Sequence, residues 1–225
     1  MSDLLLNISH CDEVKKAIIN SNHPCYSIVS SQNNDLASFQ LPEPWNGDIE
    51  NAIILFLSSN PSFDPNEEYP KATWSDDKIY QFHNDRFSDS YYIKNKTKVT
   101  FWNAMRKCTS WILNIPLDDP ELETHICSTE VVHCKSKKQY GFKEACSMCE
   151  EKWLKKTIQE FKGEYLVVMG KPAEERFRKY RLKNRNTIDK KIKVLFVPHP
   201  SRWCYIGTDQ YIRETFFTKQ LEKLL

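Results

Sequence analysis

The chain has 225 residues, of which 40% are hydrophobic and 28% are charged, as expected for one globular domain (1–225) with its own core. Only 5 glycines occur, and neither G-x-G-x-x-G nor G-x-x-x-x-G-K-[ST] is present, which argues against a glycine-rich nucleotide-binding loop. The longest apolar run, 52–57, is too short to span a membrane, and no signal peptide is recognisable. We therefore expect a cytoplasmic protein without a membrane partner.

Strand-like and helix-like segments alternate along the chain. Three runs are apolar on both faces, which is typical of strands covered on both sides of a parallel sheet. The expected strands are 52–57, 128–133, 165–169 and 194–197. The expected helices are 12–20, inside an N-terminal helical region 1–50, then 101–113, 143–161, 172–182 and 209–224. This order predicts an α/β fold, a three-layer α/β/α sandwich around a central, mostly parallel four-stranded sheet.

Two segments stand out by composition. Residues 64–100 are polar, aromatic and poorly periodic, and a stretch of that length predicts an irregular lid or insertion with a functional surface. Residues 171–193 carry a net charge of +7, although the whole chain carries only +2. This basic stripe is a candidate phosphate-binding surface.

The carboxyl ends of the four strands are followed by turns that can carry chemistry. Ligands of open α/β sheets bind beyond these strand ends. The turns are Ser58-Ser59-Asn60-Pro61-Ser62, Cys134-Lys135-Ser136-Lys137-Lys138, Gly170-Lys171-Pro172-Ala173 and His199-Pro200-Ser201. An Asn-Pro turn, a His-Pro-Ser turn and two lysine-bearing turns are therefore expected at one crevice.

In their order and spacing these turns resemble the uracil-DNA glycosylase superfamily. Its first motif is G-x-[DN]-P-[GSY] and its last is H-P-S, and its iron–sulfur branch carries T-N-V-V-[KH]-C where this chain has Thr129-Glu130-Val131-Val132-His133-Cys134. A strand ending in G-x-x-A matches Gly170–Ala173. The resemblance covers about residue 50 to the end. It implies a DNA glycosylase. We expect a monofunctional enzyme, because no lysine lies within the Asn-Pro and His-Pro-Ser motifs themselves, and Lys135 and Lys171 nearby leave a Schiff-base step as the alternative.

The resemblance also implies roles for individual residues. Asn60 would position the attacking water, and His199 would donate a hydrogen bond to the pyrimidine O2. An aromatic ring would stack on the flipped base, for which Trp74, Tyr69 and Phe63 are candidates, with Trp74 nearest in spacing. The implied DNA contacts, including a wedge at Arg202 and Trp203, are Ser62, Lys135, Lys137, Lys138, Lys171, Ser201, Arg202 and Trp203.

Glu130 departs from the pattern, because it stands where the superfamily has the asparagine that recognises uracil. A protonated carboxyl can donate to cytosine N3 while its carbonyl accepts from the N4 amino group. We therefore expect a uracil-like or modified pyrimidine as substrate, with modified cytosine, as in phage defence, an open possibility.

Six of the eight cysteines are candidate metal ligands. The iron–sulfur branch resembles this chain at Cys134 and at Cys149, or less well Cys146, but its N-terminal C-x-x-C is absent. One alternative is a [4Fe–4S] cluster on Cys11, Cys25, Cys134 and Cys149. A second is structural zinc on Cys127, Cys134, Cys146 and Cys149. A third is that no metal binds.

Three functional classes remain open from the sequence. DNA glycosylase activity with DNA as partner is the first, and the basic stripe favours it. A non-catalytic DNA-binding module of the same fold is the second, which would bind a base without releasing it. The third is a hydrolase of free nucleosides. We expect a monomer.

Overall fold

The computed structural model describes residues 3–32, 35–183 and 192–223. Its elements, in chain order, are α1 (Asp3–Ser9), α2 (Asp12–Ile19), α3 (Tyr26–Ser30), β1 (Ile54–Ser58), α4 (Asp76–Asn84), η1 (Arg86–Ser88), α5 (Ser90–Asn95), α6 (Thr100–Leu113), η2 (Leu122–His125), β2 (Ile126–Glu130), η3 (Lys137–Gln139), α7 (Phe142–Cys149), the π-helical turn η4 (Glu150–Leu154), α8 (Lys155–Glu160), β3 (Tyr165–Met169), α9 (Lys171–Lys183), β4 (Lys193–Val197), η5 (Pro200–Arg202), α10 (Trp203–Ile206), α11 (Asp209–Ile212), the π-helical turn η6 (Arg213–Thr218) and α12 (Lys219–Leu221).

The four strands form one sheet in the order β2-β1-β3-β4, and every pair of neighbours is parallel. In this register Ser58 lies opposite Glu130, and Met169 lies opposite Val197. The predicted α/β fold with a parallel four-stranded sheet is confirmed. Because all four strands run the same way, the turns that follow them meet at one edge.

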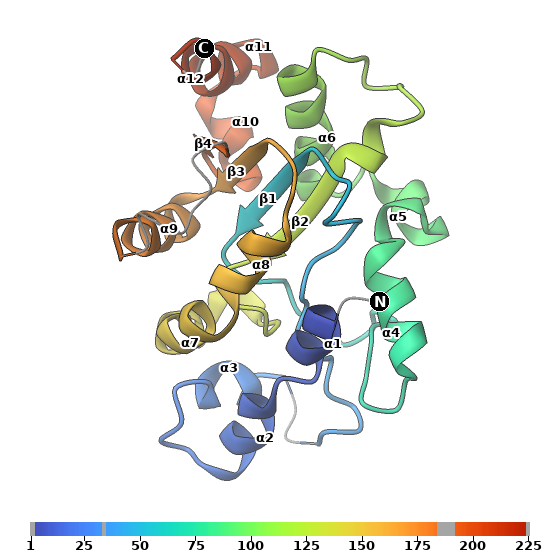
Figure 1. Ribbon diagram of the computed structural model, residues 1–225, viewed down its shortest axis with the longest axis vertical. Helices are drawn as coiled ribbons and strands as arrows, with labels where there is room; N and C mark the ends of the chain where they lie inside the picture. The colour runs from blue at the N-terminus through green and yellow to red at the C-terminus, as the bar shows by residue number, and fades with distance from the viewer. Residues whose placement is uncertain (1–2, 33–34, 184–191, 224–225) are drawn as a thin grey trace.

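Side chains of β1 alternate between two cores, one on each face of the sheet. Leu55 and Leu57 belong to the core with the N-terminal helices, α7, α8 and α9, whereas Ile54 and Phe56 belong to the core with α6 and the C-terminal helices. Figure 1 shows α2 and α3 beside α7 at one end of the molecule, and α10 to α12 beside α6 at the other. The sheet is therefore the middle of three layers.

The segment 64–100 differs from its expected irregular structure. It contains α4, η1 and α5, and side-chain caps start both α-helices. Ser75 accepts a hydrogen bond from the backbone N–H of Lys78, and Asp89 accepts one from that of Tyr92. Such caps satisfy backbone donors that a helix leaves free, so short polar helices form here without strong apolar periodicity.

Strand β2 also differs from its expected position, since it begins at Ile126 and ends at Glu130 rather than covering 128–133.

Of the basic stripe, residues 184–191 lie outside the described residues. None of the helices in the described part of the chain combines the length and apolar character needed to cross a bilayer.

Candidate functional site

The four turns meet in contacting pairs at the carboxyl edge of the sheet. The Asn60 amide Nδ2 donates to Ser136 Oγ at 3.0 Å, which joins the turns after β1 and β2. Gly170 has a φ of +88°, and a Cβ there would lie only 3.0 Å from the His199 Cβ, so glycine suits this close approach of the turns after β3 and β4. β3 lies between β1 and β4, so the two strands that precede Asn60 and His199 are about two strand spacings, ~10 Å, apart.

The Asn60 side chain is held with its carbonyl oxygen free. Its Nδ2 donates to Ser136 Oγ at 3.0 Å and to the Pro61 carbonyl at 3.1 Å, which uses both amide hydrogens. Its Oδ1 is buried and has no hydrogen-bond partner in the part of the chain that the structure describes. An amide oxygen can only accept, so Asn60 offers one oriented acceptor at the sheet edge.

The His199 ring is held in one tautomer. The backbone N–H of Ser201 donates to Nδ1 at 3.2 Å, and Ser201 Oγ lies 2.8 Å from the same nitrogen. Nδ1 therefore carries no hydrogen, and the neutral ring has its hydrogen on Nε2. Burial lowers the pKa of His199, which favours this neutral form. His199 thus presents Nε2–H as a hydrogen-bond donor.

Glu130 ends β2 as a buried acid. Its carboxyl accepts a hydrogen bond from Ser58 Oγ on the adjacent strand. Burial, with repulsion from Glu43 as the second cause, raises the pKa of Glu130 well above its usual range. The Glu130 side chain therefore favours the neutral, protonated form, which can both donate and accept.

This burial predicts a pH-dependent stability. Because folding raises the pKa of Glu130, the folded chain binds more protons than the unfolded chain above about pH 4.3, and stability falls as pH rises there. Glu130→Gln removes the titration. We expect the free energy of unfolding, measured in urea at pH 5 and pH 8, to fall less in this variant than in the wild type, by up to about 1.4 kcal/mol per pH unit. Glu151→Gln, which changes an exposed carboxyl, is the control and should keep the pH dependence of the wild type. Equal pH dependence of the unfolding free energy in the wild type and Glu130→Gln would contradict the burial of a neutral acid.

The three aromatic candidates for base stacking separate in the structure. Tyr69 is buried, with its OH donating to Glu43 at 2.7 Å. Trp74 lines a pocket beside α4. The backbone N–H of Phe63 donates to the Ser136 carbonyl at 3.3 Å, and its side chain is half-buried. Phe63, rather than Trp74, is therefore the candidate attached to the Asn60 turn.

The predicted phosphate ligands fall into two groups. Lys135 differs from its expected role, because it is buried, pairs with Glu67 at 2.7 Å and lies 3.5 Å above the Tyr69 ring. The exposed members are Ser62, Lys137, Lys138, Lys171, Ser201 and Arg202. Lys138 and Lys171 also line a groove of about 830 Å³ with Lys143 and Lys179, between the loop after β2 and α9.

Trp203 cannot act as an exposed wedge. It is buried, stacks on Trp111 at 5.9 Å between ring centroids, and donates its Nε1–H to the Pro198 carbonyl at 3.0 Å. Tyr205, two residues later in α10, is 87% exposed. The anchored indole therefore supports the helix that presents Tyr205, and Tyr205 replaces Trp203 as the aromatic wedge candidate.

An independent comparison agrees with this arrangement of turns. The family model of the uracil DNA glycosylase superfamily matches residues 44–225. The chain belongs to this superfamily. Its members are generally DNA glycosylases, which implies DNA as the partner. A search of curated proteins finds no match.

The first two cysteines precede the region that matches the superfamily, yet the fold places them beside cysteines of that region. Cys11 and Cys25 line one apolar pocket together with His133, Cys134 and Cys149. Cys127 and Cys146 do not line it, so the predicted zinc set is not gathered there. All eight cysteines are free thiols. The four pocket thiols correspond to the predicted [4Fe–4S] ligand set.

Within the described residues, the thiol pocket is not a preformed site for a metal ion. Among the described residues, no group of three or more His, Cys, Asp or Glu side chains is placed to hold one metal ion. The His133 Nδ1 donates to the Glu43 carbonyl at 2.6 Å, while its Nε2 is buried and has no partner within residues 3–32, 35–183 and 192–223. Burial raises the pKa of Cys25 to about 12, so cluster binding would have to release protons from the thiols.

Sequence reasoning missed three residues of the site: Ser58, Ser136 and Glu43. Ser58 and Ser136 lie in the motif turns, but serine is common in turns and no local pattern identifies a bond to Asn60 or Glu130. Glu43 lies outside the predicted elements, and its place beside Glu130 depends on tertiary packing. Ser58 could have been identified only from a correct alignment of β1 with β2, in which it lies opposite Glu130.

Proposed function

We propose that the protein is a monofunctional DNA glycosylase that hydrolyses the N-glycosidic bond of a flipped uracil-like or modified pyrimidine, with modified cytosine the favoured class. One observation carries this proposal. The Asn60 carbonyl oxygen, an unpaired acceptor among the described residues, and the His199 Nε2–H, a donor, lie at the same sheet edge. A cytoplasmic location suits the eight free thiols.

In the proposed reaction, Asn60 Oδ1 accepts a hydrogen bond from water and directs its oxygen toward C1′ of the flipped nucleotide. The bond between C1′ and the base nitrogen breaks, and its electron pair leaves with the base. His199 Nε2–H donates to the pyrimidine O2 as negative charge develops there. Hydroxyl is added to C1′, and the water's second hydrogen neutralises the released base.

Lysine chemistry is not needed for this reaction. Lys135 is engaged with Glu67, and Lys171 extends into solvent with 81% of its side chain exposed. Hydrolysis by water therefore fits the geometry better than attack by an amine.

Ser136 is a positioning residue for Asn60. Ser136→Ala removes the acceptor of Asn60 Nδ2, and loss of one such bond predicts a roughly 3- to 10-fold slower single-turnover rate with unchanged DNA affinity. Ser136→Thr keeps the hydroxyl and is expected to restore the rate. A parallel loss of affinity and rate in both variants would indicate a structural role instead.

The DNA path is proposed along the groove that Lys138, Lys143, Lys171 and Lys179 line. Among the described residues, Lys138, Lys143 and Lys179 have no ion-pair partner, so their charges are available to phosphates. Lys171 begins α9, where free backbone N–H groups also favour phosphate. Tyr205 would fill the space that the flipped base leaves.

A [4Fe–4S] cluster is proposed on Cys11, Cys25, Cys134 and Cys149. When bound, it would serve as a structural cross-link. These residues tie the N-terminal helices to the loop after β2 and to α7, and so hold the loop that carries Lys137 and Lys138.

Cys149→Ala tests the ligand set. We expect the wild type, purified without air, to contain about four irons and four sulfides per chain, and the variant to lose most of both. Cys108→Ala, a buried cysteine on the other face of the sheet, should retain them. Zinc without iron would favour the tetrahedral alternative, and neither metal in the wild type would contradict both.

The function itself is tested by base release. Oligonucleotides with uracil, thymine mismatches, cytosine, hydroxymethylcytosine or its glucosylated form are incubated with the protein, and released bases are measured by mass spectrometry. Release of one base that Asn60→Ala abolishes supports the glycosylase. DNA binding without any release would support the non-catalytic module, and turnover of free nucleosides would support the third class.

A further inference from the structure

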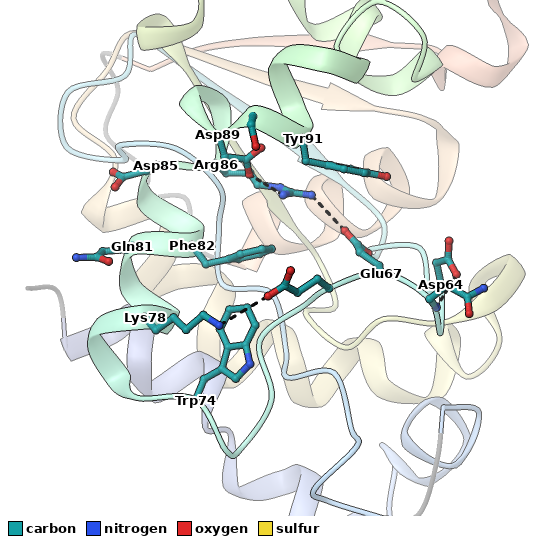
Figure 2. A pocket seen from close by; sticks show the side chains of 13 residues that line it. Asp64, Glu67, Trp74, Lys78, Gln81, Phe82, Asp85, Arg86, Asp89 and Tyr91 are labelled. Atoms are coloured by element: carbon teal, nitrogen blue, oxygen red, sulfur yellow. Dashed lines mark hydrogen bonds and ion pairs between the residues drawn. The ribbon is translucent and has the colours of Figure 1, made fainter.

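A pocket of about 480 Å³ lies between the loop 64–68 and the helices α4 and α5. Neither Asn60 nor His199 lines it. Figure 2 shows Trp74 and Lys78 on one side of this pocket, Arg86 and Tyr91 on the opposite side, and Phe82 between them. We call it the acidic–aromatic pocket because carboxylates and aromatic rings dominate its lining.

The charge of the acidic–aromatic pocket excludes phosphate as its ligand. Five carboxylates and two cationic side chains line it, which leaves a net charge of −3. Arg86 is already engaged, because it pairs with Glu67 at 3.1 Å and with Asp89 at 2.7 Å. The groove proposed for DNA is cationic, so the two cavities select opposite charges.

Aromatic faces in this pocket already bind the chain's own cations. The Lys78 ammonium lies 3.5 Å from the Trp74 ring centroid and 3.7 Å from a Glu68 carboxylate oxygen. The Arg86 guanidinium lies 4.8 Å from the Phe82 ring centroid and 5.4 Å from that of Tyr91. Arg86 is buried, but the Lys78 side chain is 54% exposed and can leave its position at little cost. The Trp74 ring and the Glu68 carboxylate, whose side chain is 84% exposed, therefore hold a cation that can exchange with solvent.

The pocket adjoins the proposed reaction site through two links. Asp64, which lines the pocket, follows Asn60 by four residues. Glu67 lines it too and pairs at 2.7 Å with Lys135, the neighbour of the Ser136 that holds Asn60. Glu67 and Lys135 therefore connect this wall of the pocket to the residues that hold Asn60.

We propose that the acidic–aromatic pocket binds a protonated alkylamine, that Lys78 is the internal occupant it displaces, and that the amine is carried by a substituent of the modified pyrimidine. This rests on the proposed function for the source of the amine. The amine chemistry itself rests on the pocket alone.

The test compares two DNAs that differ only in charge: an oligonucleotide with one 5-(3-aminoallyl)uracil, and the same oligonucleotide with that amine acetylated. Affinities are measured by fluorescence anisotropy. We expect the wild type to bind the free amine about 5-fold more tightly than the acetylated form. Glu68→Gln should bring this ratio close to one.

Lys78→Ala distinguishes displacement from a structural role. Emptying the Trp74 face should increase the amine preference about 2- to 3-fold. Lys94→Ala removes the same charge from α5 outside the pocket, and it should leave the ratio unchanged. A wild-type ratio of one, or a lower ratio in Lys78→Ala, would overturn the proposal.

Putrescine separates the two sources of amine. Binding of putrescine to the wild type but not to Glu68→Gln, together with a DNA ratio of one, would overturn the base substituent as source and support a free polyamine. Base release is measured in the same samples. Its absence from every DNA, with the amine ratio retained, would refute the glycosylase without refuting the amine site.

Discussion

Asn60→Ala is expected to lower the single-turnover rate of base excision by about 10²–10⁴-fold, the range for loss of a group that directs proton transfer or water in the transition state. The variant loses an oriented acceptor at the sheet edge, since Oδ1 is the atom of Asn60 that has no hydrogen-bond partner among the described residues. Affinity for DNA should stay close to that of the wild type, because Asn60 carries no charge for phosphate.

The matched control is Asn51→Ala, which changes an exposed asparagine near the opposite end of β1. A rate within about two-fold of the wild type in Asn60→Ala would refute water positioning by this residue. The measurement is release of base from a 5′-labelled oligonucleotide with enzyme in excess, so that product release does not enter.

Glu130→Asn is expected to reverse the base preference. The neutral Glu130 carboxyl suits the N3 and N4 groups of cytosine, whereas an asparagine amide suits the N3–H and O4 groups of uracil. We expect the ratio of uracil to cytosine-type excision to rise by about 10²-fold, as sites that hydrogen-bond a polar group reject analogues with the wrong pattern.

Glu130→Gln controls for the loss of the acid, because it keeps the shape of the side chain. Glu130→Gln should lower the rate of cytosine-type excision, and it should raise the rate of uracil excision less than Glu130→Asn does. If wild type already prefers uracil and Glu130→Asn does not change this, the side chain has no part in base recognition.

The sheet and its turns were predictable because the signals are local. β1 and β3 are continuous apolar runs, and the turns after them hold glycine or proline. β2 was harder, because Ser128, Thr129 and Glu130 are polar yet buried. Their hydrogen bonds to other elements, such as Thr129 Oγ1 to the Pro44 carbonyl at 2.7 Å, make this burial tolerable and leave no sequence pattern.

Side-chain exposure was the less predictable part of the site. Lys135 and Trp203 were both expected at the DNA surface by their position in the turns. A lysine is rarely buried unless paired, and Glu67, which pairs with it, is 68 residues earlier. Trp203 is buried because Trp111 lies beside it in α6. In both cases a partner far away in the sequence determines whether the side chain is buried, and a single sequence does not reveal that partner.

The thiol pocket has a consequence for where this protein can be divided. Two of its thiols, Cys11 and Cys25, come from residues before position 44, where the superfamily match starts. Ile28 of α3 packs closely against Gly141. A Cβ on Gly141 would lie only 2.2 Å from the backbone nitrogen of Ile28. Leu5, Ile8 and Val29 belong to the same core as Leu154. A recombinant fragment that starts at residue 44 would therefore lack the helices that cover part of this core. The N-terminal helices are better regarded as part of the same folding unit as the residues that match the superfamily.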